Sequence, residues 1–161
     1  MPGPRKLPNR DELHTWREFV ETTEVLRGAL TARLQKDTGL SPGDYAVLLA
    51  LSEATGTRLR SSDLASIIGW ERSRLSHHLA RMERRQLIRR EECITDNRGA
   101  EVVLSQAGAE AFHAATVPHL TAIRELFVDA LTPEQLAAAG EIAAALQTHL
   151  PKPSTTPGQR P

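Results

Sequence analysis

The stretch that decides the fold is RSRLSHHLARMER, residues 72–84. Leu75, Leu79 and Met82 recur at the spacing of one helical face, which predicts a helix that buries this face in a core. The same geometry predicts an outward face of polar and basic side chains, namely Arg74, His77, His78, Arg81 and Arg85. Such a face suits the major groove of DNA, because arginine can donate two hydrogen bonds to guanine. An ordinary solvated face is the alternative.

The residues before this helix predict a helix-turn-helix. Ser61 or Ser62 can cap a short helix that runs to Ile68, and Gly69 can supply the turn. Farther upstream, the segment SPGD at 41–44 is a variant of the capping box and predicts a helix to about residue 54.

The residues after it predict a β-hairpin. The helical spacing fails over residues 87–104, where two short runs, 87–93 and 100–104, flank the polar segment TDNRG at 95–99. Arg98 lies at the apex, and Gly99 permits a tight turn, so the tip suits a narrow minor groove. A surface turn with an incidental arginine is the alternative.

The outer parts of the chain predict long helices. Apolar residues recur at helical spacing over residues 11–36, and Ser105 can cap a helix to about residue 129 with a kink at Pro118. The segment TPEQ at 132–135 is a full capping box, which predicts a last helix over 133–149.

Charge is distributed unevenly along the chain. The 161 residues carry 20 basic and 20 acidic side chains, so the formal net charge is zero. Residues 58–98 nevertheless hold ten arginines against six acids. A basic central segment with an acidic remainder is typical of DNA-binding proteins, although a solvated charged face would look the same.

Several classes of function lack their sequence signals. The chain has no glycine-rich phosphate loop, no Gly-x-Ser-x-Gly and no His-Glu-x-x-His, so we expect no enzyme and no cofactor. It has one cysteine, Cys93, and no histidine pair at i, i+4, so we predict no metal site and disfavour a thiol sensor. Without a long apolar run or a signal peptide, we expect a cytoplasmic protein that does not enter the membrane.

Taken together, these elements resemble the MarR-type winged helix-turn-helix transcriptional regulators over roughly residues 11–150. The resemblance rests on Leu64-Ala65, on residues 73–83, and on DNRGAEVVLS at 96–105, which is similar to the Asp-x-Arg-Gly wing of the family. Three positions depart from the family pattern, so its base preference cannot be transferred. His77 stands where arginine is frequent, Ala80 where aspartate is frequent, and Gln86 where a helix-ending glycine is common.

The resemblance implies a mainly α fold with a small β-hairpin wing (α+β), in which helices at both ends flank a winged helix-turn-helix. It assigns residues 72–85 to the recognition helix and 87–104 to the wing. The implied domains are a flexible tail (1–10), a helical dimerisation region (11–36 and 105–150), a winged helix-turn-helix DNA-binding domain (37–104) and a disordered tail (151–161). The expected DNA contacts are Ser62, Arg72, Ser73, Arg74, Ser76, His77, His78, Arg81, Arg85 and Arg98.

We therefore expect a sequence-specific regulator, a repressor by resemblance, that binds an inverted repeat in double-stranded DNA as a homodimer. The many apolar residues of the terminal helices independently favour the homodimer. Relatives often bind small aromatic or phenolic ligands that release DNA. The residues expected near such an effector are Trp16, Phe19, Tyr45, Phe112 and His113, whose alternative role is core packing. Two other functions stay open: a winged-helix module that binds protein and not DNA, and a metal-responsive regulator of the same fold.

Overall fold

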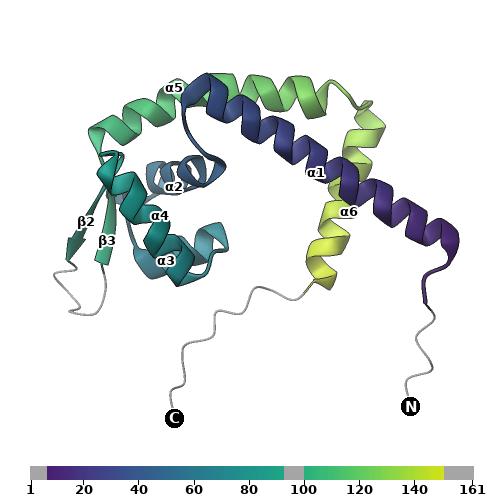
Figure 1. The fold of residues 1–161 in the computed structure, drawn as a ribbon, viewed down its shortest axis with the longest axis horizontal. Coiled ribbons are helices and arrows are strands. Elements are labelled where there is room, and N and C mark those ends of the chain that lie inside the picture. The colour runs from purple at the N-terminus through teal and green to yellow at the C-terminus, as the bar shows by residue number, and fades with distance from the viewer. Residues whose placement is uncertain (1–6, 93–99, 151–161) are drawn as a thin grey trace, which may run out of the picture.

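The computed structural model describes residues 7–92 and 100–150 of the chain (Figure 1). Two long helices, α1 (Arg10–Thr38) and α5 (Gln106–Ile123), pack together and carry a lobe of short helices and strands at one end. The last helix, α6 (Pro133–His149), descends from the other end of α5. This arrangement confirms the mainly α fold with a small winged sheet.

Capping residues set the ends of the helices as the sequence predicts. Ser41 and Asp44 form a reciprocal capping box at the start of α2 (Pro42–Glu53). Thr132 and Gln135 form another at α6. The hydroxyl of Ser105 accepts from the backbone N–H of Gly108 at the start of α5. Helix α1 begins one residue earlier than expected, because Asn9 caps it.

The helix-turn-helix consists of α3 (Ser61–Ile68) and α4 (Arg72–Arg84). Gly69 adopts a left-handed conformation at φ 66° and ends α3, as predicted. The predicted serine cap of α3 is wrong, since Arg60 occupies the cap position without a side-chain hydrogen bond. The hydroxyl of Ser61 donates instead to the carbonyl of Ala100, because strand pairing brings the two residues together.

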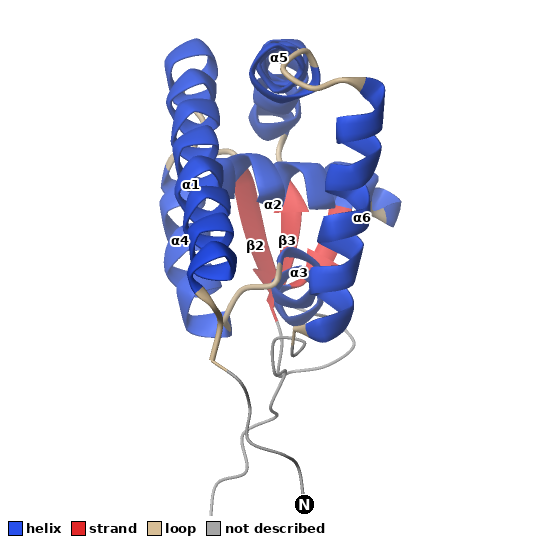
Figure 2. Ribbon diagram, turned by 90° about the vertical axis from the view of Figure 1, so that its right-hand side faces the viewer, coloured by secondary structure: helices blue, strands red, loops and turns tan. Residues whose placement is uncertain are grey.

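The sheet has three strands, one more than the sequence predicts (Figure 2). Strands β2 (Ile88–Glu92) and β3 (Ala100–Leu104) form the expected antiparallel hairpin arms. The additional strand, β1 (Arg58–Arg60), pairs with the other edge of β3, with Leu59 opposite Val102. Its three residues, Arg-Leu-Arg, are too few for a periodic signal.

After Ile123 the helix continues as a π-helical turn over Arg124–Val128. Arg33 of α1 donates to Glu125 of this turn at 3.2 Å, which ties the end of α5 to α1. Pro118 lies inside α5, and the kink expected there stays a prediction.

The core lies in the lobe, where helices α2–α4 and the sheet meet. Its fully buried large side chains are Val47, Leu48, Leu51, Leu64, Leu75, Leu79, Met82, Ile88 and Val102. The three residues of α4 that were expected to face the core are all among them. The buried face therefore fixes which side of α4 is turned outward.

Over residues 7–92 and 100–150, no helix is both long and apolar enough to cross a membrane. Within the same ranges, no three His, Cys, Asp or Glu side chains are grouped so that they could hold a metal ion.

Candidate nucleic-acid interface

Helix α4 presents a polar face to solvent. The exposed side chains expected to contact DNA are Arg72, Ser73, Arg74, Ser76, His77 and Arg81. All of them come from one helix whose other side is held by Leu75, Leu79 and Met82 in the core. This face offers guanidinium, hydroxyl and imidazole groups, the donors that proteins use on phosphates and base edges. Ser62 lies apart at the start of α3, half-buried.

Two residues expected on this face point elsewhere. His78 is only 7% exposed, and Arg85 reaches across to α2 and to the end of α1. Each follows a core residue by three positions, His78 after Leu75 and Arg85 after Met82, so helical geometry places both beside the buried face. The prediction that His78 lies with the outward residues is therefore wrong, whereas Arg85 is exposed but has its guanidinium bound to Asp44.

Both residues converge on Asp44, a carboxylate that is 2% exposed. Arg85 Nη1 donates to Asp44 Oδ2 at 2.7 Å, and the backbone N–H of Ser41 donates to the same oxygen at 2.9 Å. His78 Nε2 lies 3.0 Å from Asp44 Oδ1, a close contact that does not form a hydrogen bond. Asp44 therefore joins the start of α2 to α4.

The ionisation of Asp44 follows from these contacts. Burial alone would raise its pKa, but the interactions with His78, Ser41 and Arg85 together outweigh burial and hold the pKa well below the usual value. Asp44 thus stays charged at neutral pH.

Three arginines of the sheet, Arg58, Arg89 and Arg90, are paired with acids on the sheet or on α4. Arg90 Nη2 lies 2.6 Å from Glu83 Oε2, and hydrogen bonds from Arg90 lower the pKa of Glu83. Arg58 Nη1 lies 3.3 Å from Glu101 Oε2. Arg98, expected at the wing tip, and Cys93 lie outside the described residues, as do residues 1–6 and 151–161 of the expected tails.

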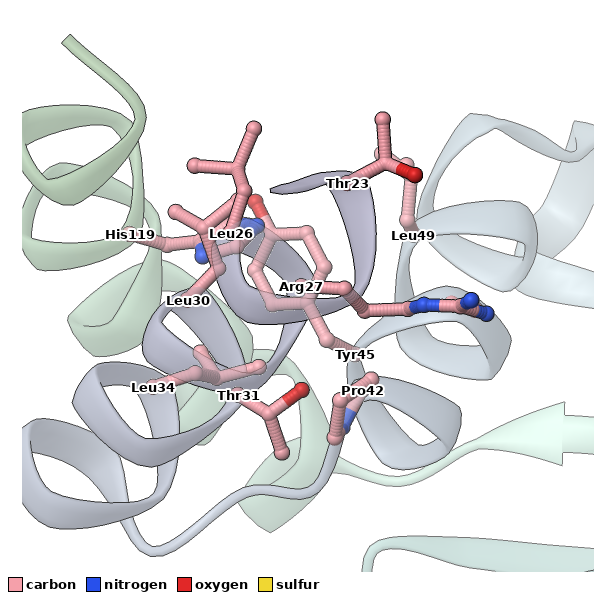
Figure 3. A pocket seen from close by; sticks show the side chains of 11 residues that line it. Thr23, Leu26, Arg27, Leu30, Thr31, Leu34, Pro42, Tyr45, Leu49 and His119 are labelled. Atoms are coloured by element: carbon pink, nitrogen blue, oxygen red, sulfur yellow. The ribbon is translucent and has the colours of Figure 1, made fainter. Parts of the chain in front are cut away.

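A cavity of about 450 Å³ opens between α1, α2 and α5 (Figure 3). Its walls are largely apolar, and the polar groups that line it include Arg27, Tyr45 and His119. His119 Nδ1 is buried and has no hydrogen-bond partner among the described residues, and burial lowers the pKa of His119. The ring centroids of Tyr45 and His119 lie 4.5 Å apart.

Of the five residues expected near an effector, only Tyr45 lines this cavity. Trp16 and Phe19 lie in the N-terminal half of α1 and are 60% and 46% exposed. Phe112 is buried and packs against Tyr45, whereas His113 faces solvent. Four of the five residues therefore do not line this cavity, and their role near an effector stays a prediction. Helical spacing alone cannot tell which turn of α1 faces α2. Arg27 and His119 were missed because they stand alone in the sequence.

A family model described as the MarR family matches residues 38–99. Two solved structures from Streptomyces coelicolor are 36% identical to this chain: AbsC, a MarR family transcriptional regulator, and Sco3205, a MarR family transcriptional regulator in complex with DNA. The AbsC alignment covers 89% of this chain and 97% of AbsC at a TM-score of 0.82. The Sco3205 alignment covers 93% of each chain at a TM-score of 0.85.

A more distant structure shares the fold. It is the organohalide-sensing regulator RdhR-CbdbA1625 in its 2,4-dichlorophenol-bound form, which is 19% identical at a TM-score of 0.77 over 99% of both chains. A search of curated protein sequences finds no match.

Proposed function

Because this chain belongs to the MarR family of DNA-binding transcriptional regulators, we propose that it is a repressor that binds an inverted-repeat operator as a homodimer. The observation that carries this proposal is the outward face of α4. Its arginines at 72, 74 and 81 are exposed while its apolar residues lie in the core. In this proposal α4 lies in the major groove, and Arg98 at the tip of the wing reaches the adjacent minor groove.

Exposed apolar side chains on α1 and α6 support the homodimer. None of the residues of α6, all of which the structure describes, is buried, although the helix carries Leu136, Ile142 and Leu146. Trp16 and Phe19 of α1 are also exposed. Large apolar side chains gathered on terminal helices favour burial against a second copy of the chain.

The cavity between α1, α2 and α5 supports control by a small ligand. Its size falls in the range of small-molecule sites, and its apolar walls with a few polar groups suit an aromatic ring that carries a hydroxyl or an anionic group. We propose that a small aromatic or phenolic ligand binds there and releases the protein from DNA. The dichlorophenol complex of a protein of the same fold is consistent with this ligand class.

The experiment that tests the proposed function is a selection of bound duplexes from a genomic library. We expect enrichment of an inverted repeat whose half-sites lie about one helical turn apart, roughly 10 base pairs. Enrichment of nothing, or of isolated half-sites bound by single chains, would contradict the proposal. Transcription from an enriched promoter should rise when the protein is deleted.

A further inference from the structure

Two exposed arginines of α4 are held by aromatic side chains beneath them. The guanidinium carbon of Arg74 lies 4.1 Å from the centre of the Trp70 ring, within the range of a cation–π contact. Arg81 Nη2 lies 3.0 Å from His78 Nδ1. Arg74 and Arg81 are seven residues apart, so they project from the same side of α4 about 10 Å apart along its axis.

The contact between Arg81 and His78 fixes the tautomer of the imidazole. A guanidinium group only donates hydrogen bonds, so His78 Nδ1 must accept and carries no proton. The ring proton then sits on Nε2, which faces Asp44 Oδ1 at 3.0 Å. The His78 ring therefore lies between the buried Asp44 carboxylate of α2 and the exposed Arg81 guanidinium of α4.

The two supporting rings also contact each other and α2. The Trp70 and His78 ring centroids lie 5.2 Å apart, with the rings nearly perpendicular. Both rings close onto Gly43: a Cβ atom there would come within 2.6 Å of Trp70 Cη2 and 2.9 Å of His78 Cε1. Gly43 thus lies against both rings, and Asp44 contacts the His78 ring.

We propose that Trp70 and His78 are positioning residues, which hold the side chains of Arg74 and Arg81 in the conformation that contacts DNA. The proposal rests on the proposed function, in which α4 contacts the operator. An exposed arginine loses much rotamer freedom when it binds, and a side chain that is already held loses less. Arg74 and Arg81 can therefore contact bases at a smaller cost in side-chain entropy. The gain in affinity should be greatest for the enriched sequence, whose bases they contact.

A double-mutant cycle separates positioning from a structural role. The probe is a duplex enriched from a random-sequence library by the parent protein, compared with unselected duplex of equal length. The proteins are the parent, His78→Phe, Arg81→Ala and the double variant. Phenylalanine keeps a ring beside Trp70 but removes both nitrogens, and Asp44 retains its bonds from Arg85 and Ser41.

We expect His78→Phe to weaken binding of the enriched duplex about tenfold in the parent and less than about twofold in Arg81→Ala, because its effect passes through Arg81. His78→Asn, whose Oδ1 takes roughly the place of Nδ1, should retain most of the affinity. Trp70→Leu should likewise weaken binding in the parent but not in Arg74→Ala, whereas Trp70→Phe, which keeps an aromatic face, should retain it. Arg124→Ala, which removes a cation outside the lobe, is the control. It should leave the affinity for the enriched duplex unchanged.

Equal losses from His78→Phe in both backgrounds would overturn the proposal, because a structural role acts without Arg81. An Arg81→Ala variant that binds like the parent would also overturn it, yet leave the proposed function intact. If the parent itself shows no preference for any enriched duplex, the proposed function fails and the positioning role fails with it. Thermal unfolding of each variant identifies those that lose binding through unfolding.

Discussion

Arg85, the C-cap residue of α4, donates a hydrogen bond to the buried carboxylate of Asp44 at 2.7 Å. The same carboxylate accepts from the backbone N–H of Ser41 in the capping box of α2. One side chain therefore serves the first turn of α2 and the last turn of α4. The Asp44 side chain therefore helps to set the orientation of α4 relative to α2. This orientation determines the direction in which the arginines of α4 project.

We predict that Asp44→Asn lowers the free energy of unfolding by about 2 to 4 kcal/mol at pH 7, somewhat less than the cost of breaking a fully buried charge pair, because Arg85 is partly exposed. The pKa of Asp44 is lowered in the folded protein. Its charge therefore stabilises the fold above the unfolded-state pKa and contributes less as pH falls below about 4. Urea unfolding of both proteins at several pH values measures the difference, which should narrow in acid.

Asp63→Asn is the matched control, since Asp63 is exposed on α3 and should change stability little at any pH. If the free energies of unfolding of Asp44→Asn and the parent differ by the same amount from neutral to acidic pH, the role assigned to the Asp44 charge is refuted.

Gly108 is required by the approach of the wing to α5. A Cβ atom at this position would clash with the backbone carbonyl of Leu87. We predict that Gly108→Ala destabilises the protein by about 1 to 3 kcal/mol, the usual cost of forcing extra atoms into a packed site. Thermal or urea unfolding measures the effect.

Gly28→Ala in the middle of α1 is the control, because a Cβ there meets nothing within 4 Å. It should raise stability by up to about 1 kcal/mol, the difference in helix propensity between alanine and glycine. If Gly108→Ala and Gly28→Ala change the stability by the same amount, the backbone at Leu87 can move away from residue 108, and the prediction is wrong.

Ile142 and Leu146 of α6 are 49% and 42% exposed in the single chain. We predict that replacing both by glutamate gives a folded monomer, because the charges disturb only the surface that a second copy would cover. Sedimentation should show a dimer for the parent and a monomer for the variant, and circular dichroism should report equal helix content. A parent that sediments as a monomer at micromolar concentration and still binds the operator fully would refute the homodimer.

Leu30 lies on the wall of the cavity. We predict that 2,4-dichlorophenol raises the melting temperature of the parent, as any ligand of the folded state does. Leu30→Trp should abolish the rise, because an indole would fill the space between α1 and α2. An equal rise in both proteins would place the phenol outside the cavity.

Patterns that are local in the sequence predicted the fold well. The caps at Ser41, Ser105 and Thr132 and the turn at Gly69 are confirmed, since each depends on neighbours within a few residues. Gln86 adopts φ 61°, the left-handed conformation that a helix-ending glycine usually takes. Strand β1 was missed because its signal is the pairing with β3, 43 residues away.

Features that depend on distant neighbours were predicted poorly. His78 and Arg85 look like outward residues of α4 until α2 brings Asp44 beside them. The cavity joins residues of α1, α2 and α5, so no sequence window contains it. The expected DNA contacts that remain exposed on α4 stay predictions, as does Arg98.

Binding of operator DNA through the cationic face of α4 is tested by the affinity for the enriched duplex. This affinity is measured at several sodium chloride concentrations for the parent and for the variant with alanine at both Arg74 and Arg81. We expect log affinity of the parent to fall linearly and steeply with log salt, with a slope of several units, because phosphate contacts release counterions. The double variant should bind enriched and unselected duplexes almost equally. A parent whose affinity is independent of salt, or a double variant that keeps the full preference for the enriched duplex, would show that α4 does not bind DNA in this way.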